Sequence, residues 1–383
     1  MIKGLFSFKK VKAWVLNLKG ISTKCYAYKG PDLVQIDCTD KCNSRCLACW
    51  VHSPLLNSKE NKDFLDIEPS ILKRFIREAK KSGTREVCFS GGGEPFLYEH
   101  IWEILEFTQK NSMPFRINTN FTLLSKRDIK RLLSYNKLAS LTVSIWAPDA
   151  GLYSELHGRN KESFDSLISN LRFLNKLKTP RLNVIVYSVM TSMNYFASKA
   201  LTNLARETGC SGIEFALIDA IPANTDSLLL NENQLSYLKS DFLGLIRQAE
   251  DFGKAFKIIN KELFLRRLSC PGASCGEYDA FVDRIPCYSG WVFLRLRANG
   301  DLNSCLKSHK IPIGNIYNES FLSIWNNASQ QEFRRKCLAL PKDKEYFKVF
   351  GNGNSAGIGC RRSCDNIFSN EHAGRLVKYL IKL

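Results

Sequence analysis

The feature that most constrains the fold is a regular alternation of short apolar runs and amphipathic stretches between residues 32 and 219. Six apolar runs have the length and composition of β-strands, and they cover residues 32–37, 85–92, 114–120, 138–146, 181–191 and 211–219. Five stretches with helical periodicity separate them, at residues 69–83, 100–111, 125–136, 161–178 and 196–209. This alternation predicts an α/β fold with a parallel sheet and helices outside it. Six such units can curl into a partial (β/α)6 barrel, with its chemistry at the carboxyl ends of the strands.

The composition is that of a globular protein with a substantial core, since 44% of the 383 residues are hydrophobic and 24% are charged. The net charge is +18, from 55 Lys and Arg against 37 Asp and Glu. Such a charge would suit an acidic partner, for example nucleic acid, a nucleotide-activated substrate or an anionic membrane face. The basic residues are not concentrated in one long run, however, which favours a basic surface spread over the whole protein.

The first 20 residues alternate Lys with apolar residues. They lack the unbroken apolar region and the small-residue cleavage site of a signal peptide. No stretch approaches about 18 uncharged apolar residues, so we expect no membrane span. An amphipathic helix on a membrane surface stays open as an alternative for this segment. We therefore expect a cytoplasmic protein.

The chain contains 14 Cys, and in a reducing compartment clustered cysteines are expected to bind metal or to do chemistry. Cys25, Cys88 and Cys210 stand apart, as small core residues do. The others fall into two groups, which are Cys38, Cys42, Cys46 and Cys49, and then Cys270, Cys275, Cys287, Cys305, Cys337, Cys360 and Cys364.

The first group follows the first predicted strand, and its Cys42-x3-Cys46-x2-Cys49 spacing resembles that of radical S-adenosylmethionine (SAM) enzymes. The resemblance covers residues 32–219 and implies a TIM-like partial barrel. It also implies a [4Fe–4S] cluster on these three thiolates, with the fourth iron open for SAM. Reductive cleavage of SAM would then give methionine and a 5′-deoxyadenosyl radical. The alternatives are a zinc site and a set of buried thiols, but with Cys38 as fourth ligand the spacing matches no zinc pattern.

Polar and glycine residues follow the next strands. SGGGEP (90–95) resembles the GGEP motif of the family, in which Gly91, Gly92, Gly93, Glu94 and Pro95 would hold the SAM amino group. The same resemblance suggests polar SAM contacts from Asn118, Asn120, Ser144 and Arg159, the last within HGR (157–159). Ordinary strand-end polarity is the alternative for these four. Ala48 departs from the aromatic residue that many members carry before the third cysteine, so adenine packing is expected to differ.

The second cysteine group contains Cys287-x12-Gly300-x4-Cys305, and Asn299-Gly300 lies between two apolar runs as in a β-hairpin. The order of this hairpin, IGNI (313–316), a helix with Trp325 and Cys360-x3-Cys364 resembles the SPASM and twitch extensions of radical SAM proteins. The resemblance implies one auxiliary [4Fe–4S] cluster, with Cys287, Cys305, Cys360 and Cys364 as ligands. Cys270 and Cys275 are left spare, and Cys337 is expected to be structural. The alternative is a hairpin with buried thiols and no cluster.

These resemblances predict an oxidoreductase that abstracts hydrogen from a substrate, with the auxiliary cluster accepting an electron in a two-electron oxidation. About 30 residues precede the first strand, so we expect no peptide-recognition domain there. Leu306 stands where sulfatase maturases carry an acidic residue. Both features favour a small molecule, such as a sugar or a nucleotide-linked sugar, and the basic charge would fit a phosphorylated substrate. A peptide or protein maturase is the alternative, followed by an RNA-modifying enzyme or a non-catalytic Fe–S protein.

The expected partners are the small-molecule substrate and an electron donor such as flavodoxin or ferredoxin, and a nucleic acid is not expected. The sequence divides into five expected segments. They are a basic amino-terminal segment (1–31), the barrel (32–220), a bridging helical region (221–284), the auxiliary-cluster domain (285–367) and a carboxyl-terminal helix (368–383).

Overall fold

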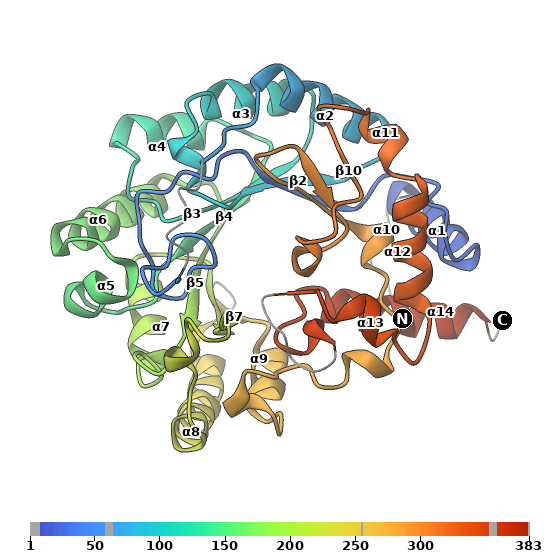
Figure 1. Cartoon of the computed structure of the whole chain (residues 1–383). Helices are drawn as coiled ribbons and strands as arrows, with labels where there is room; N and C mark the ends of the chain where they lie inside the picture. Colours follow the sequence, from blue (N-terminus) through green and yellow to red (C-terminus); the bar gives the residue numbers. More distant parts are fainter. Residues whose placement is uncertain (1–7, 58–63, 254–255, 352–357, 382–383) are drawn as a thin grey trace.

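The computed structural model describes residues 8–57, 64–253, 256–351 and 358–381. Within them, one sheet runs in the order β10-β9-β8-β1-β2-β3-β4-β5-β6-β7. Its strands are β1 (Leu33–Asp37), β2 (Glu86–Ser90), β3 (Phe115–Thr119), β4 (Leu138–Ser144), β5 (Asn183–Met190), β6 (Gly212–Leu217), β7 (Lys257–Ile259), β8 (Phe293–Leu296), β9 (Asp301–Asn303) and β10 (Gly314–Asn315). The sheet curls into an open barrel with helices around its outside (Figure 1).

The six expected strands are β1 to β6, and all neighbours among them pair in parallel. The predicted partial α/β barrel is thus confirmed. The described helices are α1 (Phe8–Ser22), α2 (Pro69–Lys81), α3 (Ile101–Lys110), α4 (Lys126–Leu133), α5 (Ala150–His157), α6 (Lys161–Leu177), α7 (Ser198–Glu207), α8 (Glu232–Gln248), α9 (Lys261–Leu268), α10 (Ser289–Val292), α11 (Phe321–Ile324), α12 (Ala328–Leu338), α13 (Lys344–Phe347) and α14 (Ile367–Ile381).

Local sequence explains where these helices begin and which face they bury. In α2, Leu72, Phe75, Ile76 and Ala79 recur at helical spacing, and all four are buried against the sheet. Ser125 caps α4 with its side chain in a reciprocal pair with Asp128. The strands alternate in the same way, since Val34 and Ile36 of β1 are fully buried. One apolar core therefore runs between the sheet and the outer helices.

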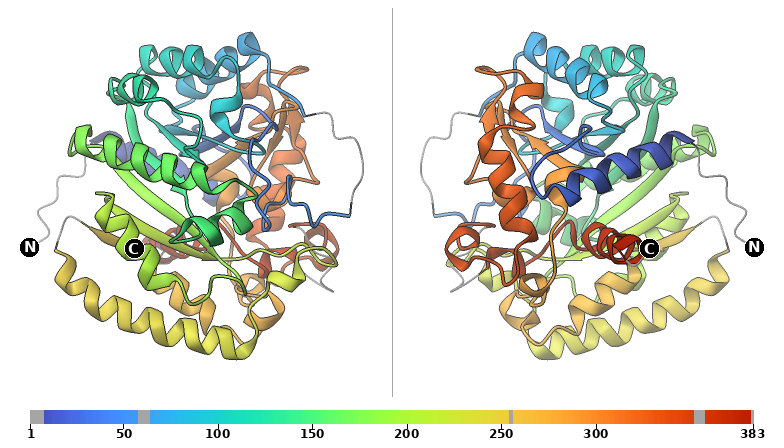
Figure 2. Two further views of the ribbon diagram at one scale, coloured as in Figure 1. Left: turned by 90° about the vertical axis from the view of Figure 1, so that its left-hand side faces the viewer. Right: turned by 90° about the vertical axis from the view of Figure 1, so that its right-hand side faces the viewer.

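The carboxyl-terminal part continues the same sheet, which the sequence pattern did not indicate. The expected hairpin is present, with β8 and β9 antiparallel around Asn299-Gly300. However, β8 also pairs in parallel with β1 over Leu33–Ile36 and Phe293–Leu296. The carboxyl-terminal elements therefore lie beside the first strand of the barrel, as the adjacent blue and orange segments of Figure 2 show.

Further elements lie outside the six expected strands and the five helices between them. Strand β7 extends the sheet beyond β6 in parallel. Helix α1 lies in the basic amino-terminal segment, of which residues 1–7 are outside the described residues, and residues Gly20 to Tyr26 pack beside the buried Trp291. The short helix α5 follows β4 and proves important for the site. No helix in the described part of the chain combines the length and apolar character needed to cross a bilayer.

Candidate radical SAM site

The loop that carries Cys42, Cys46 and Cys49 follows β1 and is fastened to other barrel loops. The backbone N–H groups of Arg45 and Leu47 donate to the carbonyls of His157 and Leu156, at 3.1 and 2.9 Å. These carbonyls end helix α5, where no further helical N–H is available to them. On the other side, the Trp50 indole donates to the carbonyl of Asp219, after β6, at 3.0 Å. The cysteine loop therefore spans the carboxyl end of the barrel.

Each of the three sulfur atoms receives a hydrogen bond from nitrogen. The N–H of Ser44 faces Cys42 Sγ at 3.5 Å. The N–H groups of Val51 and His52 face Cys49 Sγ at 3.4 and 3.3 Å. His157 Nδ1 lies 3.4 Å from Cys46 Sγ. Donors to sulfur stabilise thiolates and tune iron–sulfur clusters, so this donor set fits cluster ligands.

Burial acts on the same thiols in the opposite direction. It raises the pKa of Cys42 to about 11 and that of Cys46 well above its usual range. Without a metal these groups are therefore neutral thiols at pH 7. Because an iron ligand must be a thiolate, cluster binding releases protons here.

The glycine motif after β2 lets two backbone segments touch. A Cβ on Gly93 would overlap the Lys41 carbonyl, one residue before Cys42. In the native chain the N–H of Gly93 donates to Thr39 O at 3.0 Å, and that of Glu94 to Lys41 O at 2.8 Å. The motif thus holds the start of the cysteine loop, in addition to the role expected toward SAM.

Glu94 is buried among hydrogen-bond donors. Its carboxylate accepts from Thr119 Oγ1 at 2.6 Å, from the N–H of Asn120 at 2.7 Å and from that of Phe96 at 3.2 Å. Burial raises the pKa of Glu94 to about 7, and these donors oppose the rise. Pro95 begins the short 3-10 helix η1 (Pro95–Leu97), which sets the direction of the chain after the motif.

The four residues expected to make polar SAM contacts lie near the ends of β3 and β4 and after α5. Asn120 Nδ2 donates to Asn43 Oδ1 at 2.8 Å, and Arg159 Nη1 to the Asn43 carbonyl at 2.5 Å. Both therefore hold the residue next to Cys42. Asn118 Nδ2 donates to Ser90 Oγ at 3.1 Å, and Ser144 is half-buried at the end of β4. Their contacts with SAM stay predictions.

His157 was not expected to contact the site. Its ring is fully buried, and burial lowers its pKa to about 3. Gly158 follows with φ of +60°, and a Cβ there would come within 2.8 Å of the Arg45 carbonyl. All three residues of HGR therefore contact the cysteine loop. The HGR motif is the sequence signal for all three residues, although the family resemblance points only to its arginine.

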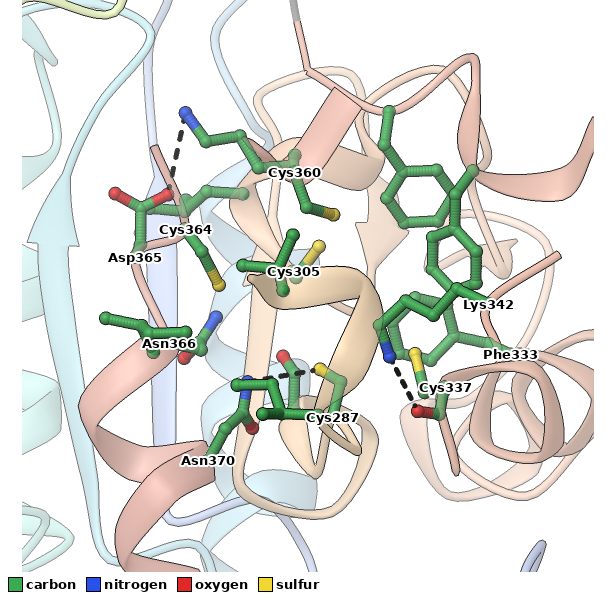
Figure 3. Close-up of a pocket in the computed structure, with 18 residues that line it drawn as sticks. Cys287, Cys305, Phe333, Cys337, Lys342, Cys360, Cys364, Asp365, Asn366 and Asn370 are labelled. Atoms are coloured by element: carbon green, nitrogen blue, oxygen red, sulfur yellow. Dashed lines mark hydrogen bonds and ion pairs between the residues drawn. The ribbon is translucent and has the colours of Figure 1, made fainter. Parts of the chain in front are cut away.

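The expected auxiliary ligands share one cavity. In Figure 3, four sulfur atoms point toward a common space, and they belong to Cys287, Cys305, Cys360 and Cys364. Cys337, from α12, lines the same cavity, so it is a fifth thiol there. Cys275 is exposed and Cys270 lies in a separate surface hollow with Phe281. The structure thus brings the four predicted ligands together and leaves the two spare cysteines outside.

The auxiliary thiols differ in how readily they lose a proton. A hydrogen bond from Cys337 lowers the pKa of Cys287 despite its burial, and Asn370 Nδ2 also lies 3.4 Å from Cys287 Sγ. Burial raises the pKa of Cys305 to about 12 and those of Cys360 and Cys364 well above their usual range. Four thiols with a donor at one sulfur are a donor set that fits an iron–sulfur cluster.

Lys307 joins the two cysteine regions. It is buried, forms an ion pair with Asp219 and lies 3.9 Å from Asp365, the residue after Cys364. Its Nζ lies 4.2 Å from the centre of the Trp50 ring, next to Cys49. Burial alone would lower the pKa of Lys307, but the two carboxylates raise it, so the ammonium stays charged. No local sequence pattern indicates this contact between distant segments.

A cavity of about 450 Å³ opens beside the cysteine loop. Trp50, Val51 and Gly92 form its wall on the barrel side, and Arg295 and His309 form the wall on the hairpin side. Its volume is in the range of small-ligand pockets. The cavity therefore lies between the predicted SAM region and the carboxyl-terminal elements.

Comparison with known families decides the identity of both regions. Residues 36–196 match the model of the radical SAM superfamily, and residues 287–349 match that of SPASM, an iron–sulfur cluster-binding domain. The chain belongs to the radical SAM superfamily. Its cofactors are a SAM-binding [4Fe–4S] cluster, SAM and a SPASM iron–sulfur cluster, as predicted. The cysteine loop lies in the radical SAM domain, and Cys287, Cys305 and Cys337 lie in the SPASM domain.

Individual relatives of this radical SAM protein are distant. It is 21% identical over 337 residues to the antilisterial bacteriocin subtilosin biosynthesis protein AlbA of Bacillus subtilis. This alignment covers 82% of this chain and 65% of AlbA. It is 24% identical over 338 residues to the GTP 3′,8-cyclase of Aquifex aeolicus, covering 83% of this chain and 97% of the cyclase. The chain thus spans less than two thirds of the length of AlbA.

Among solved structures, Streptococcus suis SuiB bound to precursor peptide SuiA aligns with a TM-score of 0.62 at 17% identity, over 87% of this chain and 73% of SuiB. At this identity the likeness concerns the fold. It extends through both the radical SAM and the SPASM regions, and so supports the architecture described above.

Proposed function

We propose that the protein is a radical SAM maturase that modifies a peptide or protein substrate. The observation that carries this proposal is the SPASM domain joined to the radical SAM barrel, an arrangement shared over most of the chain with AlbA and with the SuiB fold. AlbA is named for bacteriocin biosynthesis, and SuiB was solved with a precursor peptide. These similarities favour the peptide alternative over the sugar-like substrate that the sequence first suggested.

The chain's own residues have separate tasks in this proposal. Cys42, Cys46 and Cys49 ligate the SAM-binding cluster, and Gly91 to Pro95 hold the loop beside them. With SAM bound, that cluster would supply a 5′-deoxyadenosyl radical for abstraction of hydrogen from the substrate. Asn120 and Arg159 hold the carbonyl and side chain of Asn43, and so fix the loop geometry.

Cys287, Cys305, Cys360 and Cys364 ligate the auxiliary cluster in this proposal. The Lys307–Asp219 pair connects this region to the Trp50 side of the cysteine loop. The cavity between barrel and hairpin is large enough for one or two amino-acid side chains, and it adjoins Gly92 of the SAM motif. A peptide bound there would lie between the cysteine loop and the β8–β9 hairpin.

A small-molecule oxidoreductase is the second candidate. The similarity to GTP 3′,8-cyclase, which extends over nearly the whole length of that enzyme, supports this reading. The walls of the cavity contain Arg295 and Arg297, which would suit a phosphorylated compound. Arg295 is however already paired with Asp37, with Nε 2.7 Å from Oδ2, which weakens the argument for a second anion there.

Iron and SAM cleavage test the chemistry. We expect about eight irons per chain after anaerobic reconstitution, and about four in the variant Cys42→Ala/Cys46→Ala/Cys49→Ala. Dithionite-driven formation of 5′-deoxyadenosine should be lost in the triple variant and kept in Cys210→Ala, a control that removes a buried core thiol outside both regions. Persistent cleavage in the triple variant would show that the cluster assignment is wrong.

Isotope transfer tests the substrate class. The enzyme is incubated with SAM and dithionite, and either a uniformly deuterated protein digest or deuterated monosaccharides and nucleotides. Deuterium appearing in 5′-deoxyadenosine only with the digest supports peptide modification. Deuterium appearing only with the small molecules refutes it and favours the second candidate.

A further inference from the structure

His157 is held in one place at the end of α5. The ring is 0% exposed. It stacks on Tyr153 with a centroid distance of 4.4 Å and lies against Trp146 at 4.8 Å. These rings and the end of the helix leave the imidazole no alternative orientation that keeps both of its nitrogen contacts.

The two contacts determine which nitrogen carries the proton. The backbone N–H of Trp146 points at Nε2 at 3.1 Å. Since a peptide N–H can only donate, Nε2 must accept and is unprotonated. The proton of the neutral ring is therefore on Nδ1, which lies 3.4 Å from Cys46 Sγ. An imidazolium would place two N–H groups against each other at Trp146.

The backbone around His157 supports the same geometry. The Trp146 carbonyl accepts from Asn194 Nδ2 at 2.7 Å, which fixes the peptide next to the donating N–H. The His157 carbonyl accepts from Arg45 N, one residue before Cys46. Side chain and main chain of His157 thus hold both sides of the same loop segment.

We propose that His157 is a positioning residue that donates its Nδ1–H to the Cys46 thiolate and thereby raises the reduction potential of the SAM-binding cluster. The inference rests on the proposed function in one respect, namely that Cys46 is a ligand. Reduction adds negative charge that spreads onto the cysteine sulfurs, and a donor to sulfur stabilises that charge. The donors to Cys42 and Cys49 named above are backbone groups, whereas this one is a side chain that substitution can remove.

Two substitutions separate the contacts of the ring. In His157→Gln the amide oxygen can reach the position of Nε2 and accept from Trp146, while the donor to Cys46 is lost. In His157→Asn the amide N–H₂ can take the position of Nδ1 and still donate to Cys46, while the acceptor for Trp146 is lost. The pair therefore distinguishes loss of the sulfur hydrogen bond from general loss of packing.

The measurement is a reductive titration of the full-length, anaerobically reconstituted protein, followed by electron paramagnetic resonance. The SAM-binding cluster is identified by the change of its signal when SAM is added. Loss of a hydrogen bond to a charged group changes an equilibrium constant by about tenfold, and the equilibrium here is that between the oxidised and the reduced cluster. We therefore expect the reduced-to-oxidised ratio at a fixed potential to fall about tenfold in His157→Gln, which is about 59 mV for one electron. His157→Asn should stay close to wild type.

The outcomes are distinct. A potential in His157→Gln equal to that of wild type, with the iron content kept, overturns the inference. So does loss of this cluster from both variants, because the ring would then only support the loop. If wild type and Cys46→Ala contain equal amounts of iron and give the same SAM-responsive signal, it is the cluster assignment of the proposed function that fails.

Discussion

The buried Lys307–Asp219 pair gives a quantitative test of how the two cysteine regions are held together. The side chains are 4% and 9% exposed, and Asp219 Oδ1 is buried without a hydrogen-bond partner in the described structure. Lys307→Met keeps the length of the side chain but leaves the carboxylate uncompensated. Removing one partner of a buried ion pair costs about 3–5 kcal/mol, so we expect a loss of that size in the free energy of unfolding.

The assay is urea denaturation followed by circular dichroism, under anaerobic conditions and at fixed cluster content. Lys348→Met is the matched control, because Lys348 and its partner Glu345 are 53% and 81% exposed, and we expect little change there. The double variant Lys307→Met/Asp219→Asn should recover most of the loss, since no buried charge is then left unpaired and Asp365, the other carboxylate near Lys307, is 39% exposed. Burial raises the pKa of Asp219, and Lys307 is the main group that opposes this rise, ahead of the more weakly acting Arg362. Because a carboxyl with a raised folded pKa stabilises at low pH and loses that contribution as pH rises, the defect should shrink on acidification. A loss below about 1 kcal/mol in Lys307→Met would refute the reasoning.

Further predictions concern the two cysteine regions. Burial raises the pKa of Glu94 to about 7, above an unfolded value of about 4.3. The stability that protonated Glu94 contributes is therefore complete below about pH 4.3 and is lost as the pH rises to about 7. The slope of melting temperature against pH in this window should be flatter in Glu94→Gln than in wild type, and an unchanged slope would contradict this. Gly158→Ala should lower the free energy of unfolding by about 1–2 kcal/mol, because residue 158 has a left-handed φ of +60°. The iron content per chain should also fall. Full iron content at wild-type stability would argue against the role of HGR in holding the cysteine loop. Cys305→Ala should lower the iron from about eight to about four per chain and leave 5′-deoxyadenosine formation intact; loss of that activity would mean that the clusters do not fill independently.

Local patterns were sufficient to predict the barrel. Each strand from β1 to β6 is a short apolar run bounded by polar or glycine residues, and its position depends on its own sequence. The cysteine spacing and the glycine motif are equally local, and the structure brings Cys42 and Gly93 to the same end of the sheet. Polar residues at strand ends converge there because parallel strands share one carboxyl edge.

What the sequence did not reveal depends on contacts between distant segments. Lys307 and Asp219 are separated by 88 positions, and Cys46 and His157 by 111. Neither residue of such a pair has a local pattern that names its partner. Strand β7 has three residues, too few to show a period. For Asn120 and Arg159, the expected contacts with SAM stay predictions, whereas the contacts described are with Asn43, which only the folded loop presents.

The parallel pairing of β8 with β1 has a consequence for any attempt to study the barrel alone. A chain ending before residue 285 would leave the backbone N–H and C=O groups of β1 without their partners on one side. Val34 and Ile36 would then lie in an unprotected apolar edge strand, and such edges recruit strands from other molecules. Truncation should therefore give aggregation rather than a smaller working enzyme, and the loop that carries Cys42 would begin from the least protected strand of the sheet.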